Sequence, residues 1–176
     1  MTGSSLLNAF HQSNAALLTY TVGGDPNKET SLEIFREIAQ SGADIIECGL
    51  GHGANIGDGG AIQDGTYRAL SNGIKTDDVF DIIKTLRDEF DTNVIIMTYQ
   101  NKIMSYGEDS FLSKCVESKV AGIICVDWPW PLNLNFAAKC KNNNIDFIQL
   151  LCPTTNEERL KLILNDAHDV VYYISM

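Results

Sequence analysis

The sequence predicts an α/β fold with a parallel sheet, and three observations support this prediction. Six apolar runs of strand length recur along the 176 residues with little polar–apolar alternation, which is typical of strands covered on both faces. Helical patterns lie between these runs, and strict strand–helix alternation favours parallel βαβ units, in an open sheet or a barrel. The composition, 44% hydrophobic and 20% charged, is that of a globular protein. We expect a single domain over residues 1–176.

The expected strands are short apolar runs of five or six residues. They span residues 17–22, 44–48, 94–98, 122–126, 147–151 and 170–175.

The expected helices show apolar residues at i, i+3 and i+4 spacing. The strongest stripe covers residues 79–90, and Asp77 and Asp78 ahead of it favour a helix N-terminus. Thr155 and Glu158 have the spacing of a capping box ahead of a helix near Leu160. Weaker stripes lie in residues 32–39, 111–116 and 134–138.

The segment 49–75 interrupts this rhythm, because it is rich in glycine and follows the second expected strand. A long irregular segment at the carboxyl end of a strand is usually a functional loop. Gly49, Gly51 and Ala54 also fit the dinucleotide-binding fingerprint. That site needs a helix to begin at the last small residue, and the four glycines of residues 55–65 disfavour one. We therefore reject a dinucleotide site.

The net charge of −10 argues against nucleic acid and anionic membranes as partners. The five cysteines show no Cys-x-x-Cys pair, so buried reduced thiols are expected. His11, His52 and His168 lack metal-ligand spacing, and we expect no metal. The N-terminus has no signal-peptide pattern and no run is long enough to span a bilayer, so a cytoplasmic location is expected.

Glu47 is the first candidate for chemistry, because it interrupts an otherwise apolar strand near its carboxyl end. Ligands bind at this end of parallel strands. Burial raises the pKa of a carboxyl group toward the range useful for proton transfer. Asp58 is a second carboxylate that can fold back over the same opening. The structural alternatives are a glutamate that reaches solvent and an ordinary turn aspartate.

Motifs along the whole chain, taken together, resemble the tryptophan synthase alpha subunit family in order and spacing. They are Tyr20-Thr-Val-Gly-Gly-Asp25-Pro26, Gly42-Ala-Asp-Ile-Ile-Glu47-Cys-Gly49, Asp58-Gly-Gly-Ala-Ile62-Gln63, Met97-Thr-Tyr99-Gln-Asn101, Asp127-Trp-Pro129, Pro153-Thr-Thr155 and Tyr172-Tyr173-Ile-Ser175.

The resemblance implies a (β/α)₈ TIM barrel and a carbon–carbon lyase of tryptophan biosynthesis. The family splits indole-3-glycerol phosphate into indole and glyceraldehyde 3-phosphate. Glu47 matches the general acid–base, and Asp58 matches the carboxylate that stabilises positive charge at the indole nitrogen. The resemblance implies no cofactor, and it implies a beta subunit, which carries pyridoxal phosphate, as the partner. The residues matched to the indole pocket or its surroundings are Tyr20, Ile62, Tyr99, Asp127 and Tyr173.

Two departures from the family pattern are visible. The loop 50–57 replaces a family segment containing Pro-Phe-(Ser/Ala)-Asp-Pro-Leu-Ala, which positions the second carboxylate and touches the beta subunit. The chain also ends at Met176, in or just after the sixth expected strand. The family continues with a mobile loop and two βα units that supply the phosphate site. The expectation is thus a C-terminally incomplete barrel with about six βα units.

Two other hypotheses remain at this point. The first is a truncated or degenerate relative that acts as a non-enzymatic binding or interaction module. The second is an unrelated barrel aldolase or isomerase that acts on another phosphorylated metabolite. An aldolase that uses an amine would need a lysine at a strand exit, and none lies in the six expected strands. That absence counts against an amine-using aldolase but not against other barrel chemistries. Trp128 and Trp130 could line an aromatic pocket or cover the rim or a partner surface.

Overall fold

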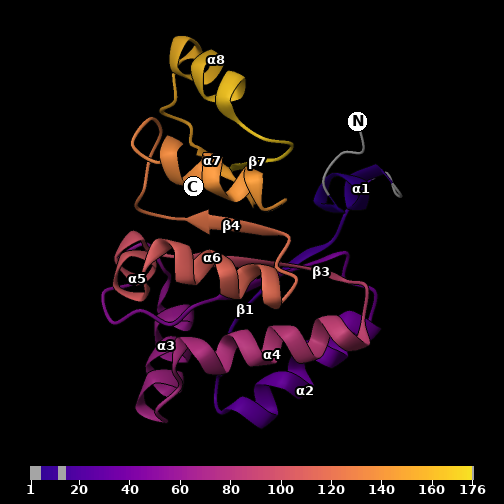
Figure 1. Ribbon diagram of the computed structural model, residues 1–176. Coiled ribbons are helices and arrows are strands. Elements are labelled where there is room, and N and C mark those ends of the chain that lie inside the picture. The colour runs from indigo at the N-terminus through magenta and orange to yellow at the C-terminus, as the bar shows by residue number, and fades with distance from the viewer. Residues whose placement is uncertain (1–4, 12–14, 176) are drawn as a thin grey trace.

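A computed structural model describes residues 5–11 and 15–175 and shows the predicted α/β architecture (Figure 1). In the described residues, one five-stranded parallel sheet has the order β1-β2-β3-β4-β5, and β6 pairs in parallel with β7. The sequential order confirms the βαβ prediction. The strands are β1 (Leu18–Val22), β2 (Ile45–Gly49), β3 (Asn93–Thr98), β4 (Gly122–Cys125), β5 (Asp146–Phe147), β6 (Gln149–Leu151) and β7 (Val171–Tyr173).

The helices include all those expected from apolar stripes and three that were not expected. The expected helices are α2 (Lys28–Gln40), α4 (Thr76–Glu89), α6 (Glu108–Glu117), α7 (Leu134–Asn142) and α8 (Glu157–Asp166). The additional helices are α1 (Ser5–His11), α3 (Gly60–Ser71) and α5 (Gln100–Tyr106). The presence of α3 corrects the prediction of an irregular segment over residues 49–75. The dinucleotide site is still absent from the described residues after β2, because α3 begins at Gly60 and not at Ala54.

The fifth expected strand is divided into β5 and β6, which pair with different neighbours. Phe147 in β5 lies opposite Ile123 of β4, whereas Leu150 in β6 lies opposite Tyr172 of β7. Between them the Ile148 N–H still donates to the Ile123 carbonyl at 2.9 Å. The division lets the chain turn from one sheet into the next, as a curving barrel wall requires.

Two apolar cores lie on opposite faces of the large sheet. On β2, Ile46 and Cys48 pack in the core beneath the covering helices, while Ile45 packs in the other core. Side chains alternate along a strand, so Glu47 shares the face of Ile45. Leu6 of α1 belongs to this second core and is 1% exposed. The sheet face that carries Ile45 and Glu47 is called the inner face below. On it, Glu47 lies next to an apolar layer that α1 helps to complete.

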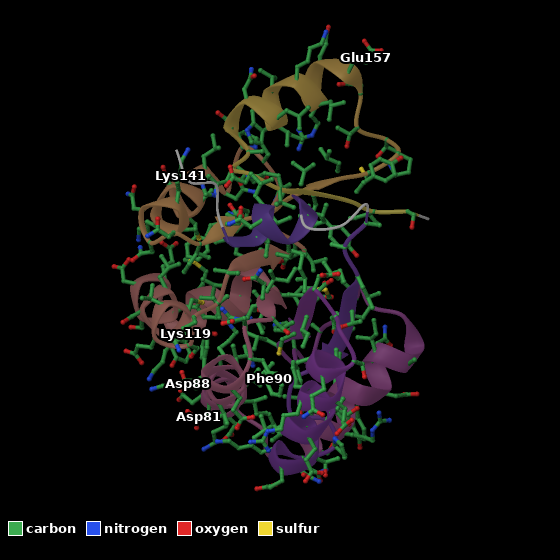
Figure 2. All side chains as sticks on the ribbon, turned by 90° about the vertical axis from the view of Figure 1, so that its right-hand side faces the viewer. Asp81, Asp88, Phe90, Lys119, Lys141 and Glu157 are labelled. Atoms are coloured by element: carbon green, nitrogen blue, oxygen red, sulfur yellow. The ribbon has the colours of Figure 1, made fainter. Side chains whose placement is uncertain are left out.

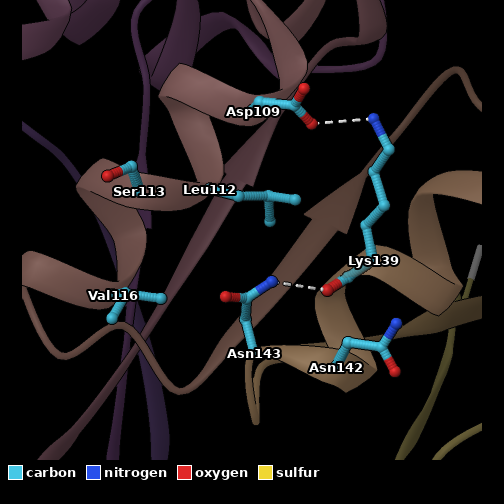
Figure 3. Close-up of a pocket in the computed structure, with 7 residues that line it drawn as sticks. All are labelled: Asp109, Leu112, Ser113, Val116, Lys139, Asn142 and Asn143. Atoms are coloured by element: carbon cyan, nitrogen blue, oxygen red, sulfur yellow. Dashed lines mark hydrogen bonds and ion pairs between the residues drawn. The ribbon is translucent and has the colours of Figure 1, made fainter.

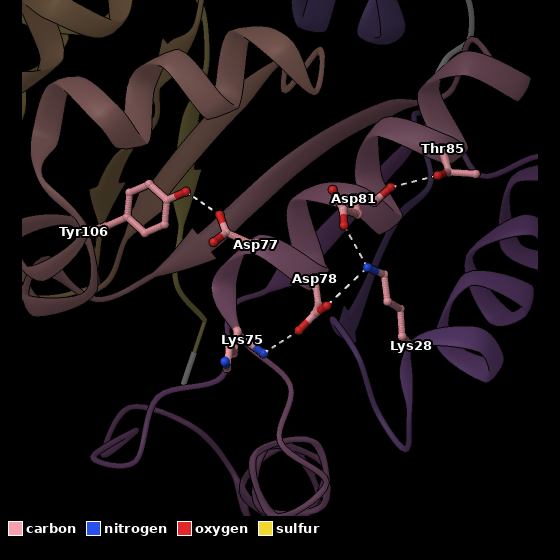
Figure 4. A network of polar contacts seen from close by, with 7 residues as sticks. All are labelled: Lys28, Lys75, Asp77, Asp78, Asp81, Thr85 and Tyr106. Atoms are coloured by element: carbon pink, nitrogen blue, oxygen red, sulfur yellow. Dashed lines mark hydrogen bonds and ion pairs between the residues drawn. The ribbon is translucent and has the colours of Figure 1, made fainter.

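Side chains with charged ends project from the outer surface (Figure 2), and polar contacts there join neighbouring helices (Figure 4). The Lys28 ammonium of α2 contacts Asp78 at 3.1 Å and Asp81 at 2.7 Å on α4. The Asp78 carboxylate also accepts the Lys75 backbone N–H at 3.0 Å, which confirms its expected capping role. Such exposed pairs contribute about 0–1 kcal/mol each. They orient α2 against α4, while the buried apolar residues supply most of the stability.

The N-terminus of α8 differs in detail from the sequence expectation. The Asn156 side chain, not that of Thr155, accepts the Arg159 N–H at 2.9 Å. The Thr155 hydroxyl instead accepts the Cys152 N–H at 3.1 Å. The helix therefore begins one residue later than a capping box at Thr155 would require.

The five cysteines are free, and all except the half-buried Cys152 are buried. Within the part of the chain that the structure describes, no helix has the length and apolar character needed to cross a membrane.

Candidate active site

A cavity of about 260 Å³ lies at the carboxyl ends of the strands and contains both predicted carboxylates. Each strand except β5 contributes a side chain to its wall, and the segment 57–62 covers one side. The wall combines two phenols and two carboxylates with an otherwise apolar surface. Its residues are Tyr20, Glu47, Gly57, Asp58, Gly59, Ile62, Met97, Ile124, Val126, Leu150, Tyr172 and Ile174.

Glu47 is a buried carboxyl group with an unusual proton affinity. Its side chain lies on the inner face of β2, opposite Tyr20 of β1, and the residue is 3% exposed. Desolvation, and to a lesser extent the negative charge of Asp58, raises the pKa of Glu47 to about 7. A group with this pKa exchanges a proton readily near neutral pH. Glu47 therefore has the properties that the sequence suggested.

Asp58 reaches the cavity from the loop that joins β2 to α3. Its backbone carbonyl accepts the Gln63 side-chain N–H at 2.8 Å, and its N–H donates to the Asn55 carbonyl at 3.1 Å. The residue lies immediately before Gly59, the N-cap of α3. Helix α3, which was not predicted, thus fixes Asp58 from the C-terminal side of that residue. Burial and the Asp58 charge also raise the pKa of Tyr20.

Tyr20 packs directly on the backbone of β2, and this contact requires a glycine. A Cβ at Gly49 would lie 2.2 Å from the Tyr20 hydroxyl oxygen. No side chain can occupy that position unless Tyr20 moves out of the cavity wall. The close approach explains why a glycine follows Glu47 and Cys48 on this strand.

Replacement of Gly49 by alanine is expected to displace Tyr20 and lower the free energy of unfolding by roughly 1–3 kcal/mol, as for other overpacked sites. Urea denaturation measures the loss. Gly53→Ala is the matched control, because a Cβ at Gly53 meets no atom within 4 Å. Equal stability of the two variants would contradict the proposed contact.

The other predicted residues occupy different places relative to the cavity. Ile62 lines it, as expected. Tyr99 is 4% exposed and lies behind the loop, where its hydroxyl accepts the Gly57 N–H at 3.2 Å. Asp127 is outside the wall, and its carboxylate accepts the Gln100 N–H at 2.6 Å.

Tyr173 also lies outside the cavity wall, with its side chain 60% exposed. Its neighbour Tyr172 lines the cavity instead, because adjacent side chains on β7 point to opposite faces. Burial, followed by the Glu47 charge, raises the pKa of Tyr172. The position expected for Tyr173 therefore belongs to Tyr172, which the sequence analysis did not select from the pair.

Several apolar wall residues were also missed. Met97, Ile124 and Leu150 lie on β3, β4 and β6 and face the cavity. The period of two within each strand is the signal that identifies them, once Glu47 fixes which face is inner. Trp128 is not among them, because it is buried beneath the helices and stacks on Phe136. The Trp130 indole N–H donates to Asp166 at 2.8 Å, outside the cavity.

A larger hollow of about 340 Å³ lies between α6 and α7 (Figure 3). Its Lys139 ammonium already pairs with Asp109 at 2.8 Å and with Glu108 at 2.9 Å. The hollow is a surface groove remote from the strand ends, where parallel folds place their chemistry. We therefore assign the candidate active site to the smaller cavity around Glu47.

Within the described residues, one group of side chains has the donor atoms to hold a metal ion. Donor atoms of Asp146, His168 and Asp169 lie within 4.8 Å of one another. The His168 ring contacts the buried Asp146 carboxylate directly, and none of the three residues lines the Glu47 cavity. His168 is half-buried and lies in the loop between α8 and β7. The side chain of His11 lies outside the described residues.

Three comparisons with known proteins agree with this architecture. A profile of the tryptophan synthase alpha chain family matches residues 6–176. This chain belongs to the tryptophan synthase alpha chain family. The alpha chain of Pelagibacter ubique is 52% identical over 162 residues, which cover 92% of this chain and 61% of the relative. The chain thus spans less than two thirds of the length of that relative.

Solved structures of tryptophan synthase give the same result for the fold. The alpha chain of Legionella pneumophila superposes with a TM-score of 0.90 at 30% identity, covering 99% of this chain and 68% of that one. A chain of the Pyrococcus furiosus tryptophan synthase complex superposes with a TM-score of 0.85 at 35% identity, covering 90% and 66%. The fold is therefore that of the family's TIM barrel over about two thirds of its length. The expected fold class is confirmed.

Proposed function

We propose that the chain is a carbon–carbon lyase that cleaves indole-3-glycerol phosphate to indole and glyceraldehyde 3-phosphate. The observation that supports it best is Glu47, a buried carboxyl with a pKa near 7, facing Asp58 in an apolar cavity. Family membership supplies the reaction class, and the cavity supplies groups suited to it.

The cleavage needs a proton on the indole carbon that carries the glycerol chain. In the proposed mechanism, protonated Glu47 delivers this proton, and the Asp58 carboxylate stabilises the resulting cation at the ring nitrogen. The Glu47 carboxylate then accepts the proton of the glycerol hydroxyl. The carbon–carbon bond breaks, its electron pair returns to the indole ring, and the former alcohol becomes the aldehyde.

The remaining wall residues are proposed to hold the indole ring. Ile62, Met97 and Ile124 give a flat aromatic ring an apolar surface, and Tyr20 and Tyr172 flank Glu47. Tyr99, Asp127 and Tyr173 lie outside the wall, and no contact with the indole ring is proposed for them. No cofactor is required by this chemistry, in which only protons are transferred.

A beta subunit is the proposed partner that receives indole. The similar structure from Pyrococcus furiosus is that of a tryptophan synthase complex. In this chain Ile56 is 90% exposed on the loop that the resemblance places at the partner surface. An exposed isoleucine next to the cavity is available for burial by a partner.

The test measures indole release from indole-3-glycerol phosphate and, separately, indole binding to the folded chain. We expect both, with release stimulated by a beta subunit. Indole binding without cleavage, with or without the beta subunit, would overturn the lyase and favour a binding module. A folded chain that neither binds indole nor releases it would overturn the assignment of the cavity as well.

A further inference from the structure

The loop 50–59 has few anchors of its own, although it carries Asp58. Four of its ten residues are glycine, and glycine loses more backbone entropy on ordering than any other residue. The Asn55 side-chain nitrogen is buried and has no hydrogen-bond partner among the described residues. An ordered loop of this composition needs contacts from outside it.

Tyr99 supplies such contacts from the end of β3. Its ring stacks on the His52 ring with centroids 5.1 Å apart and planes inclined by 23°. Its hydroxyl oxygen accepts the Gly57 N–H at 3.2 Å. The His52 Nδ1 atom also accepts the Ala54 N–H at 3.1 Å, which shapes the turn between the two contacts. One buried tyrosine therefore holds both ends of the loop.

The fit at Gly57 is close enough to make the contact specific. A Cβ at this position would lie 3.3 Å from the Tyr99 hydroxyl oxygen and 3.1 Å from Val126 Cγ1. The loop backbone thus lies directly against the two side chains. Asp58 is the next residue, so the placement of Gly57 determines where the second carboxylate enters the cavity.

We propose that His52 and Tyr99 form an aromatic clasp that fixes Gly57 and thereby positions Asp58 beside Glu47. The inference rests on the proposed function for its catalytic meaning. Both clasp residues act through Asp58 and neither lines the cavity, so they are positioning residues. This assignment gives Tyr99 a different role from the indole contact expected from the resemblance.

The test is amide hydrogen exchange of residues 50–59 in the folded chain without substrate. His52→Ala removes the stacked aromatic pair and should therefore accelerate exchange roughly two- to twelvefold. His52→Phe keeps a flat ring but lacks the Nδ1 acceptor of the Ala54 N–H. It should restore most of the protection at Gly57 and Asp58, while the Ala54 amide still exchanges faster. Ile56→Ala is the control on the same loop, because Ile56 is 90% exposed. Exchange of β3 reports whether the fold is intact in every variant.

The clasp is overturned if His52→Ala exchanges like the parent chain, or if His52→Phe exchanges as fast as His52→Ala. Indole release provides the second readout. His52→Ala should lower kcat by roughly three- to tenfold and change KM by less than about twofold, since Asp58 acts on charge that develops in the transition state. Altered exchange in a chain that releases no indole would support the clasp while the proposed function fails. Normal indole release with unaltered exchange in His52→Ala would contradict the clasp and leave the proposed function in place.

Discussion

Glu47→Gln is expected to reduce indole release from indole-3-glycerol phosphate by at least about 100-fold, within the range for loss of a general acid–base. Glutamine has nearly the same shape as protonated glutamate, so the cavity and indole binding should survive. The variant cannot donate or accept the proton that the cleavage needs. Steady-state kinetics with and without a beta subunit measure the loss. Turnover equal to that of the parent chain would remove Glu47 from the mechanism.

The same substitution should stabilise the protein at alkaline pH. The folded pKa of Glu47, about 7, lies above the ordinary glutamate value of 4.5, so the folded chain binds more protons than the unfolded chain between these two pH values. The stability that the neutral carboxyl preserves is complete below pH 4.5 and is lost as pH rises through 7. At pH 8, glutamine avoids the cost of ionising the buried carboxyl. That cost is up to about 3 kcal/mol of the free energy of unfolding, at 1.36 kcal/mol per pKa unit.

Urea denaturation at pH 4 and pH 8 should therefore show Glu47→Gln near the parent chain at the lower pH and more stable at the higher one. Glu37→Gln is the matched control, because Glu37 is exposed on α2. A difference that is the same at both pH values would show that Glu47 is not held neutral by burial.

Asp58→Asn is the second substitution with a large expected effect. The amide cannot stabilise positive charge at the indole nitrogen, and loss of one such electrostatic contact typically costs about 100- to 1,000-fold in kcat. Removal of the Asp58 charge should also lower the pKa of Glu47, because that charge is the smaller of the two causes that raise it, burial being the larger. The basic limb of the pH–rate profile should then move to lower pH.

The control is Asp64→Asn, an exposed aspartate on α3 outside the cavity wall. It carries the same change of charge and should leave both the rate and the pH profile unaltered. If Asp58→Asn behaved like Asp64→Asn, the loop carboxylate would have no part in the reaction.

The strands were predictable because burial on both faces leaves continuous apolar runs in the sequence. Helix α3 was not predictable, because its glycines and its weak apolar periodicity give no local indication of a helix. Tertiary contacts hold it instead: the Arg68 guanidinium donates to both oxygens of Asp25, at 2.9 and 2.7 Å. A Cβ at Gly65 would lie 3.0 Å from an Asp25 oxygen, so the glycine allows the helix to approach the β1 exit.

The site was predictable where one residue stood out from its surroundings. Glu47 is the lone carboxylate in an apolar strand, and its burial follows from that context. Two adjacent tyrosines at 172 and 173 carry no such signal, because the face each one takes depends on the phase of a three-residue strand. The role of Tyr99 depended on the path of a loop that departs from the family pattern, so only the folded chain could reveal it.

The most direct test of the role of Glu47 is a carbon-13 NMR titration of its side-chain carboxyl in the folded chain. We predict an apparent pKa of about 7, which falls when Asp58 is replaced by asparagine and stays above the ordinary value of a glutamate because burial persists. A midpoint near 4.5, unchanged by Asp58→Asn, would show that the carboxyl is solvated and independent of Asp58. That result would contradict a buried proton donor at the centre of this cavity.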